Sequence, residues 1–375
     1  MDTTTYGGAQ TFRPPKGIRI VLQPSLLLPL IATFLLPPTL SRTLALGSWR
    51  GPCVSHQKSR QARWGGISMS AHHPIFSRFQ AFYGEVPAYC QPDFLGTMRR
   101  REFFKDIACS PVPTLQRIGP PEFDEEYFEW IDLLESVAAA RGSYTMLDLG
   151  AGHGRWAVRA AFAVRQYWGR LPLHLIAVEA EPTVFGWMPL HFRDNGIDPA
   201  LHTLIHAAVT PTPGDVLFYI GGPRGGPFDR TPDNWYGQSV TKDYELAGPS
   251  EPDGTYCGFT VLRHATGWRS IRVPSVTLAS LLQDLGQVDL IDMDIEGQEL
   301  PVIRSTIQAL DKQVKRLHIG THGKEIEDEL RGLLFAHKWS CWADYSLFST
   351  RETPWGTISF ENGVQGWVNP RLSNS

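Results

Sequence analysis

Apolar runs alternate with amphipathic segments along most of the chain after residue 120. The apolar runs are short, as buried strands are, and the segments between them repeat apolar residues at helical spacing. The predicted strands are 144–149, 173–179, 202–209, 288–294 and 314–321, and the predicted helices are 122–140, 156–168, 183–195, 276–285, 298–310 and 324–337. This alternation predicts an α/β fold, with a mostly parallel sheet covered by helices on both faces. Two further strands, 339–348 and 356–360, are predicted to form an antiparallel hairpin at the sheet edge.

The first part of the chain lacks this rhythm. Residues 1–68 are predicted to be a leader without a core, and an apolar stretch at 25–38 follows several basic residues. That order resembles a secretory signal or a membrane anchor. The stretch is broken by proline and is shorter than the roughly 20 apolar residues that cross a membrane. Met69 is an alternative start of the chain.

The remaining residues divide into two predicted regions. Residues 69–120 contain many prolines and are expected to form a small helical cap over a pocket. Residues 121–375 are expected to form the main domain. A stretch rich in Gly and Pro, at about 221–270, interrupts this domain and reads as an insertion.

The composition of the chain limits the cellular compartments and the binding partners that are expected. The chain has 375 residues, of which 42% are hydrophobic, and its net charge is −3. Because it has no basic field and no basic stripe with interleaved aromatics, nucleic acid is not expected as a partner. The five cysteines show no zinc-type spacing. Reduced thiols and a cytoplasmic location are therefore expected, with a signal or anchor left open by the first residues.

A glycine-rich turn joins the first predicted strand to the helix that follows it. Asp148 precedes a loop in which Gly150, Gly152 and Gly154 alternate with other residues, Ala151 among them. Glycine has no Cβ, so the backbone can turn tightly and approach a ligand closely. The first turn of the helix adds free N–H groups. These five residues are predicted to bind a cofactor.

The spacing of the loop favours one kind of nucleotide. A dinucleotide site has the pattern G-x-G-x-x-G, whereas this loop reads G-x-G-x-G and has Arg155 in place of the last glycine. Asp148 would repel a pyrophosphate but suits a cationic ligand such as the amino acid end of S-adenosylmethionine. Glu179 ends the second strand, where a carboxylate can accept hydrogen bonds from ribose hydroxyls. Ala180 is included in the predicted site, and Glu181 is an alternative ribose ligand.

Three blocks of sequence resemble the FkbM-like family of S-adenosylmethionine-dependent methyltransferases. They are LDLGAGHG at 147–154, IAVEAEP at 176–182 followed by AAVTPTPGDVLF from Ala207, and 276–299, where VTLASLL precedes VDLIDMDIEGQE. The resemblance covers about 120–345. It implies a class I methyltransferase (Rossmann-like) fold, methyl transfer usually to oxygen, and acceptors such as sugars, polyketides or other secondary metabolites.

Three carboxylates lie two residues apart at the end of the fourth predicted strand. Asp292, Asp294 and Glu296 would share one face of an extended strand, and their repulsion would raise at least one pKa unless a cation intervenes. Three roles stay open: acid/base chemistry or acceptor positioning, binding of Mg²⁺ by Asp292 and Asp294, and capping of the next helix. The resemblance places Asp294, Glu296 and Gly297 beside the acceptor, although the family often has Lys at position 292.

His322 follows the next strand and is predicted to lie beside these carboxylates. A neutral imidazole with a pKa near 6.5 can accept a hydroxyl proton at neutral pH. Asp294, Glu296 and His322 are therefore the predicted catalytic residues. His318 lies earlier in the apolar strand and is interpreted as structural. The family tends to have Glu two residues before this histidine, where the chain has Gly320.

The insertion supplies the predicted acceptor contacts. Trp235, Gln238 and Ser239 combine a stacking surface with amide and hydroxyl groups, which suits a planar or sugar-like molecule. An ordered surface loop with a buried Trp is an equal interpretation.

These observations predict a methyltransferase that transfers a methyl group from S-adenosylmethionine to a hydroxyl oxygen of a small molecule. The use of Mg²⁺ is left open. The alternatives are an N-methyltransferase and a non-catalytic protein that keeps the fold as a binding module. The expected partner is the small-molecule acceptor, without nucleic acid or a membrane, and a homodimer is left open.

Overall fold

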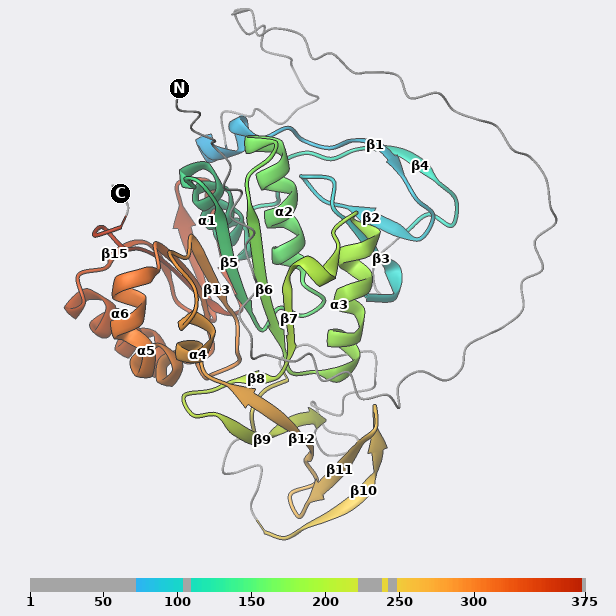
Figure 1. Ribbon diagram of the computed structural model, residues 1–375, viewed down its shortest axis with the longest axis vertical. Coiled ribbons are helices and arrows are strands. Elements are labelled where there is room, and N and C mark those ends of the chain that lie inside the picture. Colours follow the sequence, from blue (N-terminus) through green and yellow to red (C-terminus); the bar gives the residue numbers. More distant parts are fainter. Residues whose placement is uncertain (1–71, 104–108, 222–237, 242–247, 373–375) are drawn as a thin grey trace, which may run out of the picture.

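The structure is a computed structural model, and it describes residues 72–103, 109–221, 238–241 and 248–372. The predicted leader, including its apolar stretch, lies outside these residues. A seven-stranded sheet forms the centre of the molecule (Figure 1). Its strands, in order across the sheet, are β15 (Ser340–Tyr345), β18 (Gly363–Val368), β14 (Arg316–Thr321), β13 (Leu290–Met293), β5 (Tyr144–Leu149), β6 (Leu173–Glu179) and β7 (Thr203–His206).

The sheet is parallel apart from one strand. β18 runs antiparallel to both of its neighbours, β14 and β15, and every other neighbouring pair is parallel. The predicted α/β fold with a mostly parallel sheet is therefore confirmed, as is the antiparallel pair at its edge. The second strand of that pair is β18, which the sequence pattern did not predict.

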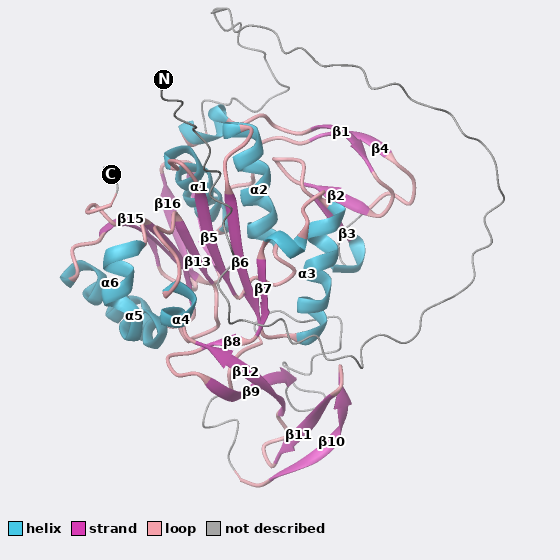
Figure 2. Ribbon diagram, in the orientation of Figure 1, coloured by secondary structure: helices cyan, strands magenta, loops and turns pink. Residues whose placement is uncertain are grey.

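Helices cover both faces of this sheet (Figure 2). Side chains alternate between the faces of a strand, so Met146 of β5 joins the apolar core on one face and Leu147 joins the core on the other. The first core includes residues of α1 (Glu126–Ala139), α2 (Arg155–Trp168) and α3 (Pro182–Asp194). The second includes residues of α4 (Leu278–Leu282), α5 (Glu299–Gln313) and α6 (Lys324–Ala336).

One predicted helix is shorter than expected. The pattern predicted a helix over 276–285, but Val276 still belongs to a strand, and Thr277 begins the turn into α4. The Thr277 side chain accepts a hydrogen bond from the backbone N–H of Ser280, which is the usual way in which a threonine caps a helix. The polar cap therefore separates strand from helix at this position.

A second sheet holds the described part of the predicted insertion. It contains β8 (Ala208–Val209), β9 (Gly214–Gly221), β10 (Ser250–Tyr256), β11 (Phe259–His264) and β12 (Arg269–Val276). In Figure 1 this sheet lies beyond the end of the central sheet at which β7 leads into β8. The predicted strand 202–209 is thus divided between the two sheets.

The residues before α1 form short strands and 3-10 turns, so the expected helical cap is wrong in its described part. The elements are the turns η3 (Pro74–Arg78) and η4 (Arg101–Phe103) and the strands β1 (Tyr83–Val86), β2 (Cys90–Pro92), β3 (Met98–Arg100) and β4 (Thr114–Arg117). β1 pairs with β4, and β2 pairs with β3. Prolines interrupt helical hydrogen bonding in this region and favour such short elements.

Near the end of the chain, two further strands form a small hairpin. β16 (Ser349–Thr353) pairs with β17 (Gly356–Phe360) outside the central sheet. The predicted strand 356–360 is therefore present, but it does not join the sheet edge. Within the described residues, no helix is both long and apolar enough to cross a membrane.

Candidate active site

A cavity of about 720 Å³ lies at the carboxyl ends of the central strands. Its walls come from β5, β6, β13 and β14, from the first turns of α1 and α2, and from the second sheet. Ligands in parallel α/β sheets bind at this end of the strands. The predicted residues that line it are Asp148, Gly150, Ala151, Gly152, Glu179, Ala180, Gln238, Asp292, Asp294 and Glu296.

Several other predicted residues lie outside the cavity wall. Gly154 begins α2 and packs against α3, where a Cβ would lie 2.9 Å from carbons of Met188 and Phe192. Ser239 is buried, and its backbone carbonyl accepts a hydrogen bond from Tyr219. His322 lies behind the cavity wall, whereas Trp235 lies outside the described residues.

The glycine loop is pressed against the end of β13. A Cβ on Gly150 would lie 1.7 Å from the backbone oxygen of Asp294, and Gly150 has a φ of +80°. A side chain cannot occupy that space, and this φ favours glycine. The absence of a side chain at position 150 therefore allows the strand ends of β5 and β13 to meet at the cavity.

Two carboxylates hold the shape of this loop. Asp148 accepts a hydrogen bond of 3.0 Å from the backbone N–H of Ala157 in the first turn of α2. Glu179 accepts one of 2.8 Å from the N–H of Gly152 and one of 2.7 Å from the N–H of Glu181. Burial raises the pKa of Glu179 to about 7, against the lowering effect of these N–H groups.

Glu181, the alternative ribose ligand, has its own partners. Its side chain accepts a hydrogen bond of 2.6 Å from the backbone N–H of Val184 and caps α3. The Tyr256 hydroxyl donates to its other oxygen at 2.5 Å. Glu181 is therefore occupied in joining α3 to the second sheet.

The acidic turn after β13 is closed by a buried carboxylate. Glu299, at the start of α5, accepts hydrogen bonds of 3.0 Å from the backbone N–H of Gly297 and a longer one of 3.3 Å from Ile295. This contact folds the turn back on the helix, and Glu296 within it has a φ of +53°, which is rare for residues other than glycine. The turn therefore has a fixed shape that presents Asp294 and Glu296 at the cavity.

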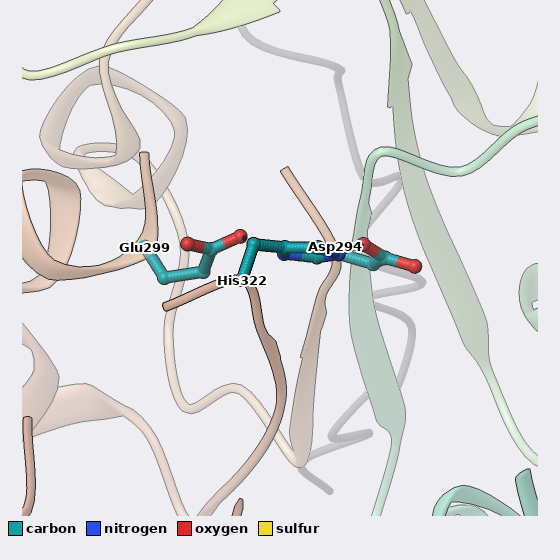
Figure 3. Close-up of side chains that lie close together, drawn as sticks. All are labelled: Asp294, Glu299 and His322. Atoms are coloured by element: carbon teal, nitrogen blue, oxygen red, sulfur yellow. Dashed lines mark hydrogen bonds and ion pairs between the residues drawn. The ribbon is translucent and has the colours of Figure 1, made fainter. Parts of the chain in front are cut away.

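His322 lies between the carboxylates of this turn (Figure 3). Its Nδ1 is 2.9 Å from Glu299 Oε1, and its Nε2 is 3.3 Å from Asp294 Oδ1 and 3.5 Å from Glu296 Oε2. The structure thus brings the three predicted catalytic residues together. Sequence reasoning found their proximity because neighbouring parallel strands end at the same edge of the sheet.

The charge on His322 differs from the one expected. Burial opposes its protonation, but the hydrogen bond to Glu299 and the charges of Asp294, Glu299 and Glu296 raise its pKa to about 10. At neutral pH it is an imidazolium that balances the acidic turn. The interpretation of His322 as a neutral imidazole ready to accept a proton is therefore wrong.

The carboxylates proposed for Mg²⁺ do not fit such a site. Burial and the charge of Asp292 raise the pKa of Glu129, in α1, well above its ordinary value. The protonated form of Glu129 is therefore favoured, and a protonated carboxyl group is a poor ligand for a cation. Near Asp294, the remaining ligand candidates are Glu299, which is occupied by backbone N–H groups, and the protonated His322. Hard cations require several free oxygen ligands.

Comparison with known proteins identifies the family. The model of the Methyltransferase FkbM domain matches residues 148–336, which is half of the chain. The chain belongs to the FkbM methyltransferase family. Membership implies S-adenosylmethionine as the methyl donor.

Individual FkbM-like relatives and solved structures are distant. A protein of Jannaschia sp. (strain CCS1), named as a methyltransferase, is 25% identical over 235 residues, which are 62% of this chain and 75% of that protein. The solved methyltransferase FkbM from Methylobacillus flagellatus KT has a TM-score of 0.35 and 12% identity, covering 66% of this chain and 56% of its own. Precorrin-6y C5,15-methyltransferase from Geobacter metallireducens GS-15 has a TM-score of 0.32 and 12% identity, covering 63% of this chain and 86% of its own.

Glu129 and His318 are among the residues of this FkbM methyltransferase that line the cavity without having been predicted as site residues. Glu129 comes from α1, and His318 comes from the middle of β14. The helix that contains Glu129 was predicted from its apolar positions alone. His318 falls in an apolar run, where a histidine is more often structural. A buried polar residue opposite Asp292 in the strand register was the available signal.

Proposed function

We propose that this protein is a methyltransferase that transfers a methyl group from S-adenosylmethionine to a hydroxyl oxygen of a small molecule. The main observation in support of this proposal is that the glycine loop and the acidic turn line the same cavity of about 720 Å³. This volume is within the range of roughly 300–1,000 Å³ found for small-molecule sites. The bound donor supplies an electrophilic methyl group on a sulfonium.

The residues of the cavity suit that donor. Among the described residues, its wall contains ten carboxyl groups and one guanidinium, that of Arg155, which favours a ligand with positive charge. Glu179 is in place to accept ribose hydroxyls with the lone pairs that Gly152 and Glu181 leave. Apolar side chains, including Val209 and Phe218, line the same cavity and suit a purine ring.

The acceptor is expected at the other end, beside Asp294 and Glu296. Gln238 also lines the cavity and can hydrogen bond to a polar acceptor, in keeping with the part assigned to it from the sequence. His322 acts as a positioning residue here, because its positive charge holds the two carboxylates in place. Alignment of an acceptor oxygen with a methyl group can remove about 7–11 kcal/mol of barrier.

The acidity of the cavity favours a second candidate, an amine acceptor. Carboxylates bind an ammonium group directly, so an N-methyltransferase would use the same surface. A nucleic acid acceptor is disfavoured, because the cavity wall would repel phosphates.

Calorimetry of the full chain with S-adenosylmethionine tests the proposal. We expect saturable binding that EDTA leaves unchanged and that Glu179→Gln weakens about tenfold, which corresponds to one charged hydrogen bond of roughly 1.5 kcal/mol. Glu329→Gln is a matched control, since this exposed carboxylate pairs with Arg304 on the outside of the molecule. Radiolabelled methyl transfer to panels of small hydroxyl and amine compounds then separates the two candidates. A folded protein that binds no donor would overturn the proposal and favour a non-catalytic binding module.

A further inference from the structure

His318 and Asp132 form a buried pair that opens onto the cavity. His318 Nδ1 lies 2.8 Å from Asp132 Oδ2, and their side chains are 5% and 0% exposed. His318 belongs to β14 and lines the cavity beside Asp292 and Gly320, whereas Asp132 reaches it from α1. His318 therefore lies in the wall of the cavity, as His153 does, whereas His322 lies behind the wall.

Asp132 is held in one orientation by further donors. Its Oδ1 accepts hydrogen bonds of 2.6 Å from Arg316 Nη1 and 2.8 Å from Trp342 Nε1. Gly366 of β18 leaves room for this contact, because a Cβ there would lie 2.3 Å from Trp342 Nε1 and 3.0 Å from Asp132 Oδ2. A carboxylate fixed in this way also fixes the imidazole that it binds.

The hydrogen bond determines which nitrogen of His318 can exchange a proton with a ligand. The Asp132 side chain is the acceptor for Arg316 and Trp342, so Nδ1 of His318 is the donor in their contact and carries a hydrogen. The proton that His318 gains or loses is therefore the one on Nε2. An aspartate that orients a histidine in this manner also stabilises the imidazolium that forms during proton transfer.

We propose that His318, oriented by Asp132, takes the proton of the acceptor hydroxyl through Nε2, and that the positive charge of the bound methyl donor prepares it by expelling the proton already there. This inference rests on the proposed function. In the transfer step the acceptor oxygen bonds to the methyl carbon, and the carbon–sulfur bond breaks with its electron pair left on sulfur. The hydroxyl proton passes to Nε2 of His318.

The charges around His318 explain why the donor is needed. The charged groups near His318 come from four elements: Asp132 and Glu129 from α1, Asp292 and Asp294 from the end of β13, Asp148 from β5, and Arg316 from its own strand. The neighbouring strands β18 and β15 contribute the uncharged residues Gly366 and Trp342. Burial opposes protonation, but Asp132, Asp292 and Asp294 raise the pKa of His318 above its ordinary value. A positive charge bound in the same cavity would repel the imidazolium form of His318 and lower its pKa. The donor therefore shifts His318 toward its neutral form.

Proton release on binding tests this idea without any acceptor. Calorimetry of the full chain in buffers of different ionisation enthalpy, between pH 6 and 9, counts the protons released by S-adenosylmethionine and by S-adenosylhomocysteine, which lacks the sulfonium charge. We expect greater release with S-adenosylmethionine, and a clearly smaller difference in His318→Gln, where only carboxyl groups such as Glu179 still respond to the charge. The matched control is His337→Gln, because His337 Nδ1 also lies 2.7 Å from an aspartate, Asp311, but outside the cavity.

The outcomes separate the two proposals. No donor binding would overturn the proposed function. Donor binding with equal proton release for both ligands at every pH, or a difference that is unchanged in His318→Gln, would overturn the role of His318 alone. If His318→Gln does not fold, Asp132→Asn keeps the histidine and removes the carboxylate that raises its pKa, so the difference should move to lower pH. The wild-type comparison of the two ligands needs no variant.

Discussion

At the scale of single residues, position 150 is the place in the site where a side chain is least tolerated. Gly150→Ala would place a methyl group 1.7 Å from the backbone oxygen of Asp294, so the ends of β5 and β13 would have to separate. We expect a loss of at least about 3 kcal/mol in the free energy of unfolding, as for strained or overpacked core positions. Chemical denaturation followed by tryptophan fluorescence measures this loss.

Gly142→Ala is the control for backbone strain alone. Gly142 has a φ of +71°, close to the +80° of Gly150, but a Cβ there would meet no atom within 4 Å. The expected cost is about 1 kcal/mol. Equal losses in the two variants would contradict the close approach of the glycine loop to β13.

His322 predicts how stability depends on pH. Its pKa of about 10 in the folded protein lies above the ordinary value of 6.5, so the folded state binds the proton more tightly than the unfolded state. The stabilisation is complete below pH 6.5 and is lost as pH rises toward 10. We expect wild type to exceed His322→Gln by a few kcal/mol at pH 6 and by much less at pH 10, measured by urea denaturation. A difference that is constant with pH would show that His322 is neutral in the folded protein.

At the scale of elements, the apolar pattern predicted the core strands because they are buried on both faces. β5 and β6 have the predicted bounds. The bounds of α2, α3 and α6 differ from the predicted ones by at most one residue at each end. β18 was missed because Gly363–Val368 contains two glycines and the polar Gln365, which is buried with a hydrogen bond to the backbone of Glu327. Tertiary contacts decided this element, and local propensity did not.

The candidate site was predictable in part for the same reason. Parallel strands end at one edge, which brings Asp294 and His322 together whatever their exact contacts are. The charge of His322 was not predictable, because it depends on Glu299 folding back from α5. Glu129 was hidden in a helix whose packing against β13 the sequence does not reveal.

At the scale of the whole molecule, the acidic cavity contrasts with a nearly neutral chain. The net charge is only −3, so the ten carboxyl groups of the cavity wall produce a local field that the rest of the surface does not extend. Glu125 and Glu361 lie at the accessible part of this wall, where salt screens charges over about 8 Å at physiological ionic strength. Approach of a cationic ligand should therefore depend on salt.

Stopped-flow fluorescence can measure that approach, because Trp156 lines the cavity and can report on binding. We expect the association rate of S-adenosylmethionine to fall several-fold between low salt and 0.5 M salt, since electrostatic steering is lost. S-adenosylhomocysteine has the same shape without the sulfonium charge, so its association rate should change little, and the dissociation rates of both should be nearly constant. Parallel salt dependences for the two ligands would mean that the carboxyl groups do not attract the ligand through their field, because protonation of groups with raised pKa values, such as Glu129, already neutralises the cavity.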